Sequence, residues 1–308
     1  MIVAVIRLNS VRPLFYPVAP FLVEMLSSKL SAIFLLTDIP VWTRPLENSL
    51  RHRGASVRVG SDLSAAEDFN MVVNRISTQL LRIAPEDLEQ LRRALERLES
   101  QGRPVINGLA SLEIGLSKMK QTALFQACQV ATPETALAIA GGRALPGREV
   151  LLKPPRGGFG KGIQSLSREE TAPPDLDSSL EWIEQEFLMP VDGLVHRIEL
   201  LGDRILYDAA TPFQPGEFDY CLAKAGHESR LTSSEAIDAE VQDQALQIAR
   251  KAGMELGALE YFLLADGRPC FFDFNPVSSL HPKAAELLGQ DPIQMTADYI
   301  LRSAVSSK

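Results

Sequence analysis

A segment in the middle of the chain combines lysine with glycine in a pattern suited to phosphate. Lys153 ends an apolar run and precedes a loop. The glycines and the lysine of this loop are Gly157, Gly158, Gly160, Lys161 and Gly162. Because glycine has no side chain, its backbone can approach a ligand closely and turn N–H groups toward it. Such donors beside cations suit an oxyanion, most often phosphate. The alternative is a hairpin tip with solvated charges.

The order of the segment, strand, lysine, glycine loop and strand, does not fit three common phosphate motifs. A Walker A lysine is followed by Ser or Thr and a helix, whereas Lys161 is followed by Gly162. A dinucleotide fingerprint spaces its glycines as G-x-G-x-x-G before a helix, whereas residues 163–166 form a β-type run. A protein kinase places its lysine after the loop, and Lys153 comes before it.

Two carboxylates and an amide form a second cluster near the C-terminus. Glu260 lies in one β-type run, and Asp273 and Asn275 lie in the next, across the turn Asp266-Gly267. Residues two apart on a strand share a face, so Asp273 and Asn275 align, and pairing of the strands places Glu260 opposite them. These hard oxygen ligands suit Mg²⁺, with Mn²⁺ as an alternative. The competing interpretation is a hairpin with polar residues on its solvent face.

Composition narrows the classes of protein that fit. The chain has 308 residues, enough for two or three small domains, and its 45% apolar and 23% charged residues are ordinary for a globular protein. The net charge of −8 argues against nucleic acid as a partner. No apolar run approaches about 18 residues, so no membrane span is expected. Cys128, Cys221 and Cys270 are far apart, which favours buried thiols in a reducing, cytoplasmic protein.

The elements that must position these residues follow an α/β order. Alternating strands and helices in the first third predict a parallel sheet. The predicted strands are residues 2–6, 32–37, 56–60 and 71–73, the helices are 16–30 and 84–101, and a further strand begins at 105. A first domain is therefore expected over residues 1–105.

The remainder of the chain predicts mixed α+β structure in two further domains, 106–183 and 184–308. Helices are expected at 118–129 and 236–252, and hairpins at 197–201 with 204–207 and at 259–264 with 269–273. Residues 179–188 fit either a helix or a strand by periodicity.

Taken in order, these segments resemble the ATP-grasp superfamily, most closely the RimK-like glutamate ligases and glutathione synthetases. The resemblance covers residues 105–288 well and the N-terminal region more loosely. The segments that carry it are Asn74–Ser77, Asn107, Ser117-Lys118, Thr132–Thr135, Lys153–Gly162, Gln185–Leu188, Arg197–Asp203, and Glu260 with Asp273 and Asn275.

The resemblance implies an ATP-grasp fold, with an N-terminal parallel α/β domain and a nucleotide enclosed between two α+β subdomains. Lys118 and Lys153 would contact the phosphates of ATP, and the loop 156–162 would close over them. The residues expected at the adenine are Gln185, Glu186, Phe187 and Leu188. Lys153 and Arg197 would be catalytic, with Arg197 facing the transferred phosphate or the acyl substrate. Glu260, Asp273 and Asn275 would hold Mg²⁺.

The sequence also departs from the pattern of this group. Asp273 stands where glutamate is commoner, and Val195 stands where related ligases carry a carboxylate for the ribose. We expect Asp192, three residues earlier, to take that role. Ser278, Ser279 and His281 replace the usual continuation after the metal residues and are candidates for substrate selection. For His281 the alternative is a surface or capping histidine.

The implied activity is ATP-dependent carboxylate–amine ligation through an acylphosphate. One substrate is expected to be glutamate or another amino acid, and the amine would belong to a peptide, a protein tail or a small cofactor precursor. Phosphoryl transfer requires positioning and charge neutralisation more than acid–base chemistry, which suits this residue set. The rival interpretations are an ATP-grasp kinase and a non-catalytic nucleotide-binding regulator. A homodimer is the default assembly.

Overall fold

The computed structural model describes residues 32–61, 69–78, 84–155, 160–214, 216, 218, 229–278 and 280–306. The strand predicted at 2–6 and the helix predicted at 16–30 lie outside these residues, as do Gly157, Gly158, Cys221 and Ser279. Cys128 and Cys270 are buried free thiols, as expected. Every described helix is too short or too polar to cross a bilayer.

The N-terminal sheet is parallel, as the alternation of strands and helices predicts. Its described strands are β1 (Ala32–Leu36), β2 (Ser56–Gly60), β3 (Met71–Asn74) and β4 (Val105–Ile106), in the order β2-β1-β3-β4. All neighbouring pairs run in the same direction. The carboxyl ends of these strands therefore meet at one edge, and the residues that follow β3 leave from that edge.

Helices cover both faces of this sheet. The helix α3 (Pro85–Ser100) matches the predicted 84–101, because leucines three and four apart bury one stripe. Those leucines, Leu88, Leu91, Leu95 and Leu98, pack with Phe34 and Val72. The helix α2 (Pro40–His52) was not predicted, since it contains a proline at its first residue and a second, Pro45, inside it.

A second, antiparallel sheet has the order β5-β8-β6-β7. Its strands are β5 (Thr135–Leu137), β6 (Val150–Lys153), β7 (Gln164–Leu166) and β8 (Ile183–Glu186). The strands β6 and β7 pair as a hairpin, which confirms the predicted order of strand, lysine, loop and strand. The segment 179–188, whose periodicity fits either a helix or a strand, contains the strand β8.

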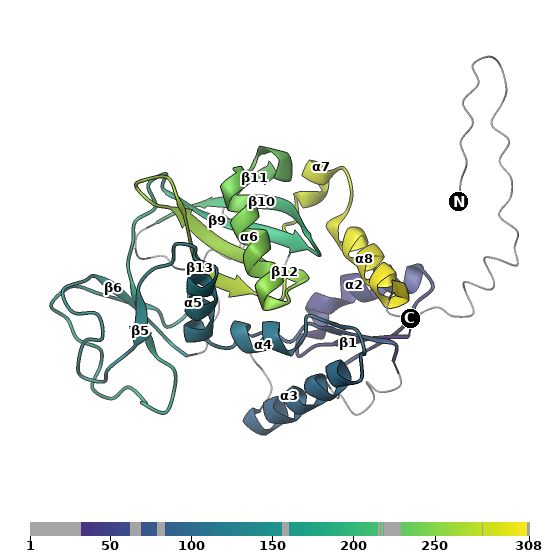
Figure 1. Cartoon of the computed structure of the whole chain (residues 1–308), viewed down its shortest axis with the longest axis horizontal. Helices are drawn as coiled ribbons and strands as arrows, with labels where there is room; N and C mark the ends of the chain where they lie inside the picture. Colours follow the sequence, from purple (N-terminus) through teal and green to yellow (C-terminus); the bar gives the residue numbers. More distant parts are fainter. Residues whose placement is uncertain are drawn as a thin grey trace, which may run out of the picture. The chain divides into compact units, whose positions relative to one another are not determined.

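The third sheet has the order β11-β10-β9-β12-β13 and contains both predicted hairpins. Its strands are β9 (Leu194–Leu201), β10 (Arg204–Pro212), β11 (Arg230–Ser233), β12 (Leu256–Leu263) and β13 (Pro269–Asn275). The helix α6 (Ala239–Ala252), predicted at 236–252, packs on one face of this sheet (Figure 1). The opposite face carries Arg197 and Glu260.

A buried asparagine joins the first sheet to the third. Asn107 follows β4, and its side-chain amide donates to the carbonyls of Leu256 and Pro276 at 2.5 and 2.6 Å. Its Oδ1 accepts from the amides of Glu255 and Leu256 at 2.7 and 3.0 Å. Asn107, one of the residues that carry the family resemblance, therefore holds the strand β12 in place.

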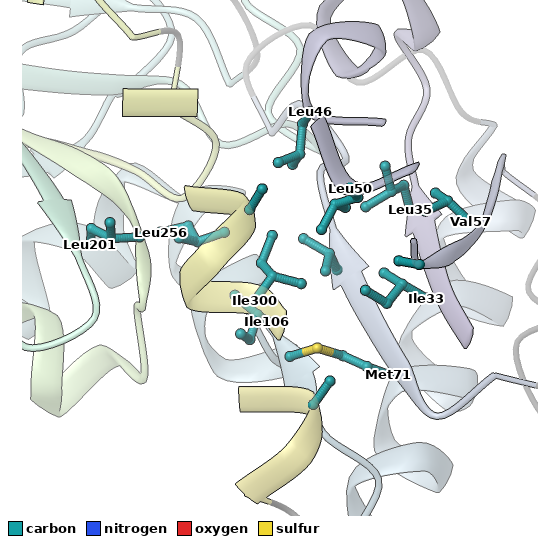
Figure 2. Close-up of a cluster of buried hydrophobic side chains, with 14 of the residues drawn as sticks. Ile33, Leu35, Leu46, Leu50, Val57, Met71, Ile106, Leu201, Leu256 and Ile300 are labelled. Atoms are coloured by element: carbon teal, nitrogen blue, oxygen red, sulfur yellow. The ribbon is translucent and has the colours of Figure 1, made fainter. Parts of the chain in front are cut away.

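The last part of the chain returns to the N-terminal core. The helices α4 (Leu109–Gly115) and α5 (Lys118–Ala127) follow the first sheet. The last two described helices, α7 (Ala284–Leu288) and α8 (Pro292–Ser306), follow the third sheet. The helix α8 lies beside α2 (Figure 1). Its Ile300 joins the buried cluster that includes Leu35, Leu50 and Leu256 (Figure 2). The two predicted domain boundaries remain predictions.

Candidate active site

One cavity of about 510 Å³ gathers most of the residues that the sequence singles out. The predicted residues in its lining are Lys118, Lys153, Gly160, Lys161, Gln185, Glu186, Phe187, Leu188, Arg197, Glu260, Asp273 and Asn275. They come from α5, from both antiparallel sheets and from the turn after β6. The lysine and glycine cluster and the carboxylate cluster, about a hundred residues apart in the sequence, thus line one cavity.

The oxygen ligands predicted for a metal lie side by side at the end of the β12–β13 hairpin. Glu260 pairs directly with Asp273 across the two strands, next to a bulge. The Nδ2 of Asn275 lies 3.4 Å from Oε1 of Glu260 and 3.3 Å from Oδ2 of Asp273. The alternative of a solvent-facing hairpin is therefore wrong, because all three side chains line the cavity.

The charges of this trio are consistent with a divalent cation. Burial raises the pKa of Glu260, and the neighbouring Asp273 raises it further, against the effects of Arg197 and Lys118. For Asp273 burial also acts to raise the pKa, but Lys118 and the other nearby cations outweigh it and the pKa is lowered. Two buried carboxylates in contact need positive charge between them. The donor set, two carboxylates and an amide, is of the kind that Mg²⁺ takes.

Lys118 stands at the start of α5 and points to the trio. Ser117 caps this helix, and its Oγ accepts from the amide of Lys120 at 3.1 Å. The Nζ of Lys118 forms an ion pair with Asp273 and lies 3.3 Å from Oε1 of Gln121. The cap therefore fixes the first turn of the helix, from which the ammonium group extends.

Lys153 reaches the cavity from the end of β6 and has no carboxylate partner among the described residues. Its Nζ donates to Oε1 of Gln185 at 2.6 Å and stands 5.6 Å from the centre of the Phe272 ring. Burial, together with the charge of Lys118, lowers the pKa of Lys153 to about 8. A phosphate group would supply the negative charge that this ammonium lacks.

The described part of the glycine loop needs glycine for its backbone. Gly160 and Gly162 have φ angles of 67° and 78°, which other residues rarely adopt. A Cβ at Gly162 would also lie 3.3 Å from Pro154. Gly160 and Lys161 line the cavity, and Gly162 does not. The lid role of the whole loop remains a prediction.

The segment predicted to hold adenine follows β8. The amide of Glu186 donates to the carbonyl of Glu134 at 2.8 Å, and the amide of Phe187 donates to that of Glu149 at 2.9 Å. The amide of Leu188 donates no such backbone hydrogen bond within the described part of the chain. Apolar side chains, among them Leu151, Ile163, Phe262 and Phe272, also line the cavity. The arrangement suits a flat heterocycle with one backbone contact.

Arg197 is already bound to two carboxylates. Its Nε donates to Glu199 at 2.9 Å and its NH1 donates to Glu260 at 2.8 Å. Burial acts to lower its pKa, but Glu199 and Glu260 outweigh burial and raise it above the ordinary value. Glu199 is fully buried and also accepts from the hydroxyl of Ser278. The guanidinium is therefore a fixed cation beside the trio.

Comparison with known proteins identifies the fold. No protein-family model matches the sequence, and no curated protein matches it. Solved structures do match. The ATP-grasp ligase PsnB, in complex with a variant of a minimal precursor, Mg and ADP, aligns with a TM-score of 0.61 and 17% identity over 89% of this chain and 99% of that one. The chain has the ATP-grasp fold.

Two further structures agree with this assignment. The D-cycloserine synthetase DcsG aligns with a TM-score of 0.64 and 18% identity, over 89% of this chain and 99% of that chain. A RimK-domain ATP-grasp protein from Sphaerobacter thermophilus aligns with a TM-score of 0.60 and 18% identity, over 88% of this chain and 99% of that chain. The predicted fold class is therefore confirmed, while these identities do not decide the substrates.

The carboxylate expected at the ribose of an ATP-grasp nucleotide lies away from the cavity. Asp192 is not in the lining, whereas Val195 is. The Oδ2 of Asp192 lies 3.0 Å from Nε2 of His196, and its Oδ1 accepts from the amide of Leu194 at 3.1 Å. The geometry gives the ribose role of Asp192 no support.

His281 makes local hydrogen bonds in the turn before α7, and that helix has no side-chain cap. Its amide donates to the hydroxyl of Tyr207 at 2.8 Å, and its Nδ1 accepts from the amide of Lys283 at 3.1 Å. It is buried and does not line the ATP-grasp cavity. Ser278, by contrast, lines the cavity through the segment that follows β13.

The N-terminal sheet contributes residues to the site that the sequence did not assign. Arg75, Ser77 and Thr78, which follow β3, line the cavity, as do Trp42 of α2 and Thr296 of α8. The position of Arg75, directly after β3, is a usable signal, because α/β sheets bind ligands beyond the carboxyl ends of their strands. The segment Asn74–Ser77 is part of the family resemblance, but the resemblance assigns no role to Arg75.

Proposed function

We propose that this protein is an ATP-dependent carboxylate–amine ligase. It would activate the carboxylate of glutamate or another amino acid as an acylphosphate and join it to an amine. The observation that carries the proposal is the convergence of Lys118 and Lys153 with Glu260, Asp273 and Asn275 on one cavity. The ATP-grasp fold and the ADP and Mg in the PsnB complex support ATP and Mg²⁺ as its ligands.

The chemistry follows from the residues in the cavity. A carboxylate is a poor electrophile, and transfer of a phosphoryl group to it creates a leaving group that an amine displaces. Lys118 and Lys153 neutralise phosphate charge, which is the main requirement of a loose phosphoryl-transfer transition state. Glu260, Asp273 and Asn275 would hold Mg²⁺, which neutralises phosphate oxygens when bound. Arg197, fixed by two carboxylates, adds positive charge at a set position.

An acylphosphate hydrolyses readily, so the site must exclude water. Phe262 and Phe272 line the cavity with apolar surface. Gly160 and Lys161 border it from the turn between β6 and β7. Closure of this turn over bound nucleotide would protect the intermediate until the amine attacks.

The test is a phosphate-release screen with ATP, Mg²⁺ and a panel of amino acids and amines, followed by mass spectrometry. Ligation yields ADP, phosphate and a product lighter by one water than the summed substrates. A phosphorylated product without an amide would instead identify a kinase. If the protein binds ATP but no acid and amine of the panel supports turnover, the correct interpretation is the non-catalytic nucleotide-binding regulator.

A further inference from the structure

Arg75 lines the cavity and has no anionic partner among the described residues. It follows β3 at the carboxyl edge of the N-terminal sheet and lines the cavity. Its NH2 donates to the carbonyl of Ser278 at 3.2 Å. Its Nε is buried and has no hydrogen-bond partner, and within the described part of the chain no carboxylate forms an ion pair with it. A buried guanidinium left in this state carries an uncompensated desolvation cost.

The nearest negative charge is committed elsewhere. Burial lowers the pKa of Arg75 to about 10, and Glu199 only partly opposes this effect. Glu199 instead accepts from Nε of Arg197 and from the hydroxyl of Ser278. Arg75 is therefore charged at neutral pH, close to an acid that other groups already satisfy.

The two arginines of the cavity consequently differ. The described lining holds five cationic side chains, Arg75, Lys118, Lys153, Lys161 and Arg197, against three carboxylates, Glu186, Glu260 and Asp273. Arg197 is shared between two carboxylates, whereas Arg75 still has donors to offer. The planar fork of arginine matches a carboxylate in a bidentate manner.

The position of Arg75 decides which carboxylate it fits. The reacting carboxylate must lie at the phosphate centre, beside Lys118 and the trio. Arg75 comes from a separate element, the N-terminal sheet, and contacts the chain three residues beyond Asn275, at Ser278. Ser77 and Thr78, from the same segment, add hydroxyl groups to this end of the cavity.

We propose that Arg75 binds a second, non-reacting carboxylate of the acid substrate, and that this substrate is a small dicarboxylate, such as a dicarboxylic amino acid. The inference rests on the proposed ligase activity and narrows its substrate class. Arg197, which the resemblance places at the transferred phosphate or the acyl substrate, would serve as a fixed cation beside the trio.

The experiment uses matched pairs of acids with ATP and Mg²⁺, and hydroxylamine as the amine. Hydroxylamine converts an acylphosphate to a hydroxamate with release of phosphate, so hydroxamate and ADP report activation of the acid. The pairs differ by one carboxylate: glutamate and 4-aminobutyrate, aspartate and 3-aminopropanoate, glutarate and butyrate. The enzymes are the wild type, Arg75→Gln, Arg75→Lys and the control Arg93→Gln, whose side chain is exposed on α3.

We expect the wild type to prefer at least one dicarboxylate over its matched monocarboxylate. Arg75→Gln should raise the KM for that dicarboxylate about 10- to 100-fold with a smaller change in kcat, because a contact remote from the reacting centre is uniform binding. The KM for the monocarboxylate should not change. Arg75→Lys should be intermediate, since it keeps the charge and loses the fork. Arg93→Gln should match the wild type.

Other outcomes separate this proposal from the ligase assignment. Equal use of both members of each pair, or an Arg75→Gln variant that loses affinity for MgATP instead, overturns the role of Arg75 and leaves the ligase intact. If no acid supports ADP release, the ligase proposal fails. Calorimetric titration of glutamate and glutarate then still tests the site: binding that is lost in Arg75→Gln supports it, and an absence of binding to the wild type overturns it.

Discussion

At the scale of single residues, the two site lysines differ in what surrounds them. Lys118 is paired with Asp273, whereas Lys153 contacts the neutral Gln185 and the face of an aromatic ring and has no carboxylate partner in the described ranges. The charge of Lys153 is therefore the one that a bound phosphate would stabilise most. Its lowered pKa follows from the same isolation, because burial disfavours the ammonium form.

Replacement of Lys153 by methionine should weaken MgATP binding about 10- to 100-fold, the value of a charge-assisted hydrogen bond. Because the pKa of Lys153 is about 8 in a pocket that also holds Lys118, Glu260 and Asp273, its ammonium is present below pH 8 and lost above it. Binding to the wild type should therefore weaken from pH 7 to pH 9, and Lys153→Met should lack that change. Calorimetry measures both effects, with exposed Lys251→Met as the control.

Asp273→Asn should abolish most Mg²⁺-dependent turnover and leave the fold intact. The substitution keeps the shape of the side chain but removes one of two adjacent buried charges, so metal affinity falls while repulsion of Glu260 is relieved. We expect a loss in kcat of at least about 100-fold, measured as ADP release across a Mg²⁺ titration. A melting temperature close to that of the wild type is required. Collapse of the fold, or an unchanged Mg²⁺ dependence, would refute the assignment.

At the scale of elements, the strands of the third sheet place charged groups on both faces. One face carries Arg197 and Glu260 to the cavity. The opposite face carries His196 of β9. Its Nδ1 lies 2.7 Å from Oδ2 of Asp208 in β10, and its ring stacks on Tyr261 of β12. Its Nε2 reaches Asp192 in the turn before β9 at 3.0 Å. The histidine therefore ties three strands and a turn together.

This histidine should stabilise the sheet in a pH-dependent manner. Burial acts to lower the pKa of His196, but Asp208 and Asp192 outweigh burial and raise it. A raised folded-state pKa contributes stability that is complete below the unfolded value of about 6.5 and is lost as pH rises through the folded value. His196→Gln should thus lower the free energy of unfolding by about 1 to 3 kcal/mol at pH 6, and by less at pH 9.

Urea unfolding at the two pH values measures this difference. The control is His52→Gln, at an exposed position near the end of α2. An equal destabilisation at pH 6 and pH 9 would show that His196 acts by packing alone and not through its charge.

At the scale of the whole described structure, the C-terminal helix completes a core begun near residue 32. Ile300 of α8 is fully buried with side chains of β1, α2 and β12 (Figure 2). The helix also brings Ile293 and Thr296 to the cavity lining. One element therefore supports both the N-terminal sheet and the site.

Ile300→Ala should lower the free energy of unfolding by about 2 to 5 kcal/mol, because it leaves a cavity where several elements meet. Val305→Ala, five residues later at a 65% exposed position, should change it by less than about 0.5 kcal/mol. Urea unfolding followed by two optical probes tests both variants and checks that the transition is cooperative. Similar values for the two would mean that α8 is not part of the core.

Local sequence patterns were sufficient for the elements whose signals are short in range. The turns Gly202-Asp203 and Asp266-Gly267 predicted hairpins, and the leucine spacing of α3 predicted its buried stripe. The helix α2 was missed, because two prolines concealed it. Asp192 was placed at the ribose from a loop-length argument, and in the structure it contacts His196 and is not among the residues that line the cavity.

By itself, the sequence determined the lysine and glycine loop and the alignment of Asp273 with Asn275, since strand geometry relates residues only a few positions apart. It also determined the parallel character of the first sheet, because strands that alternate with helices form parallel sheets. Only the tertiary structure decided that Arg197 is held by two acids while Arg75 is left without one. It also decided that α8 returns to the first sheet. These facts depend on contacts between residues far apart in the sequence, such as Arg197 with Glu260 at 63 positions and Arg75 with Ser278 at 203 positions. Burial and pairing of distant elements select such contacts.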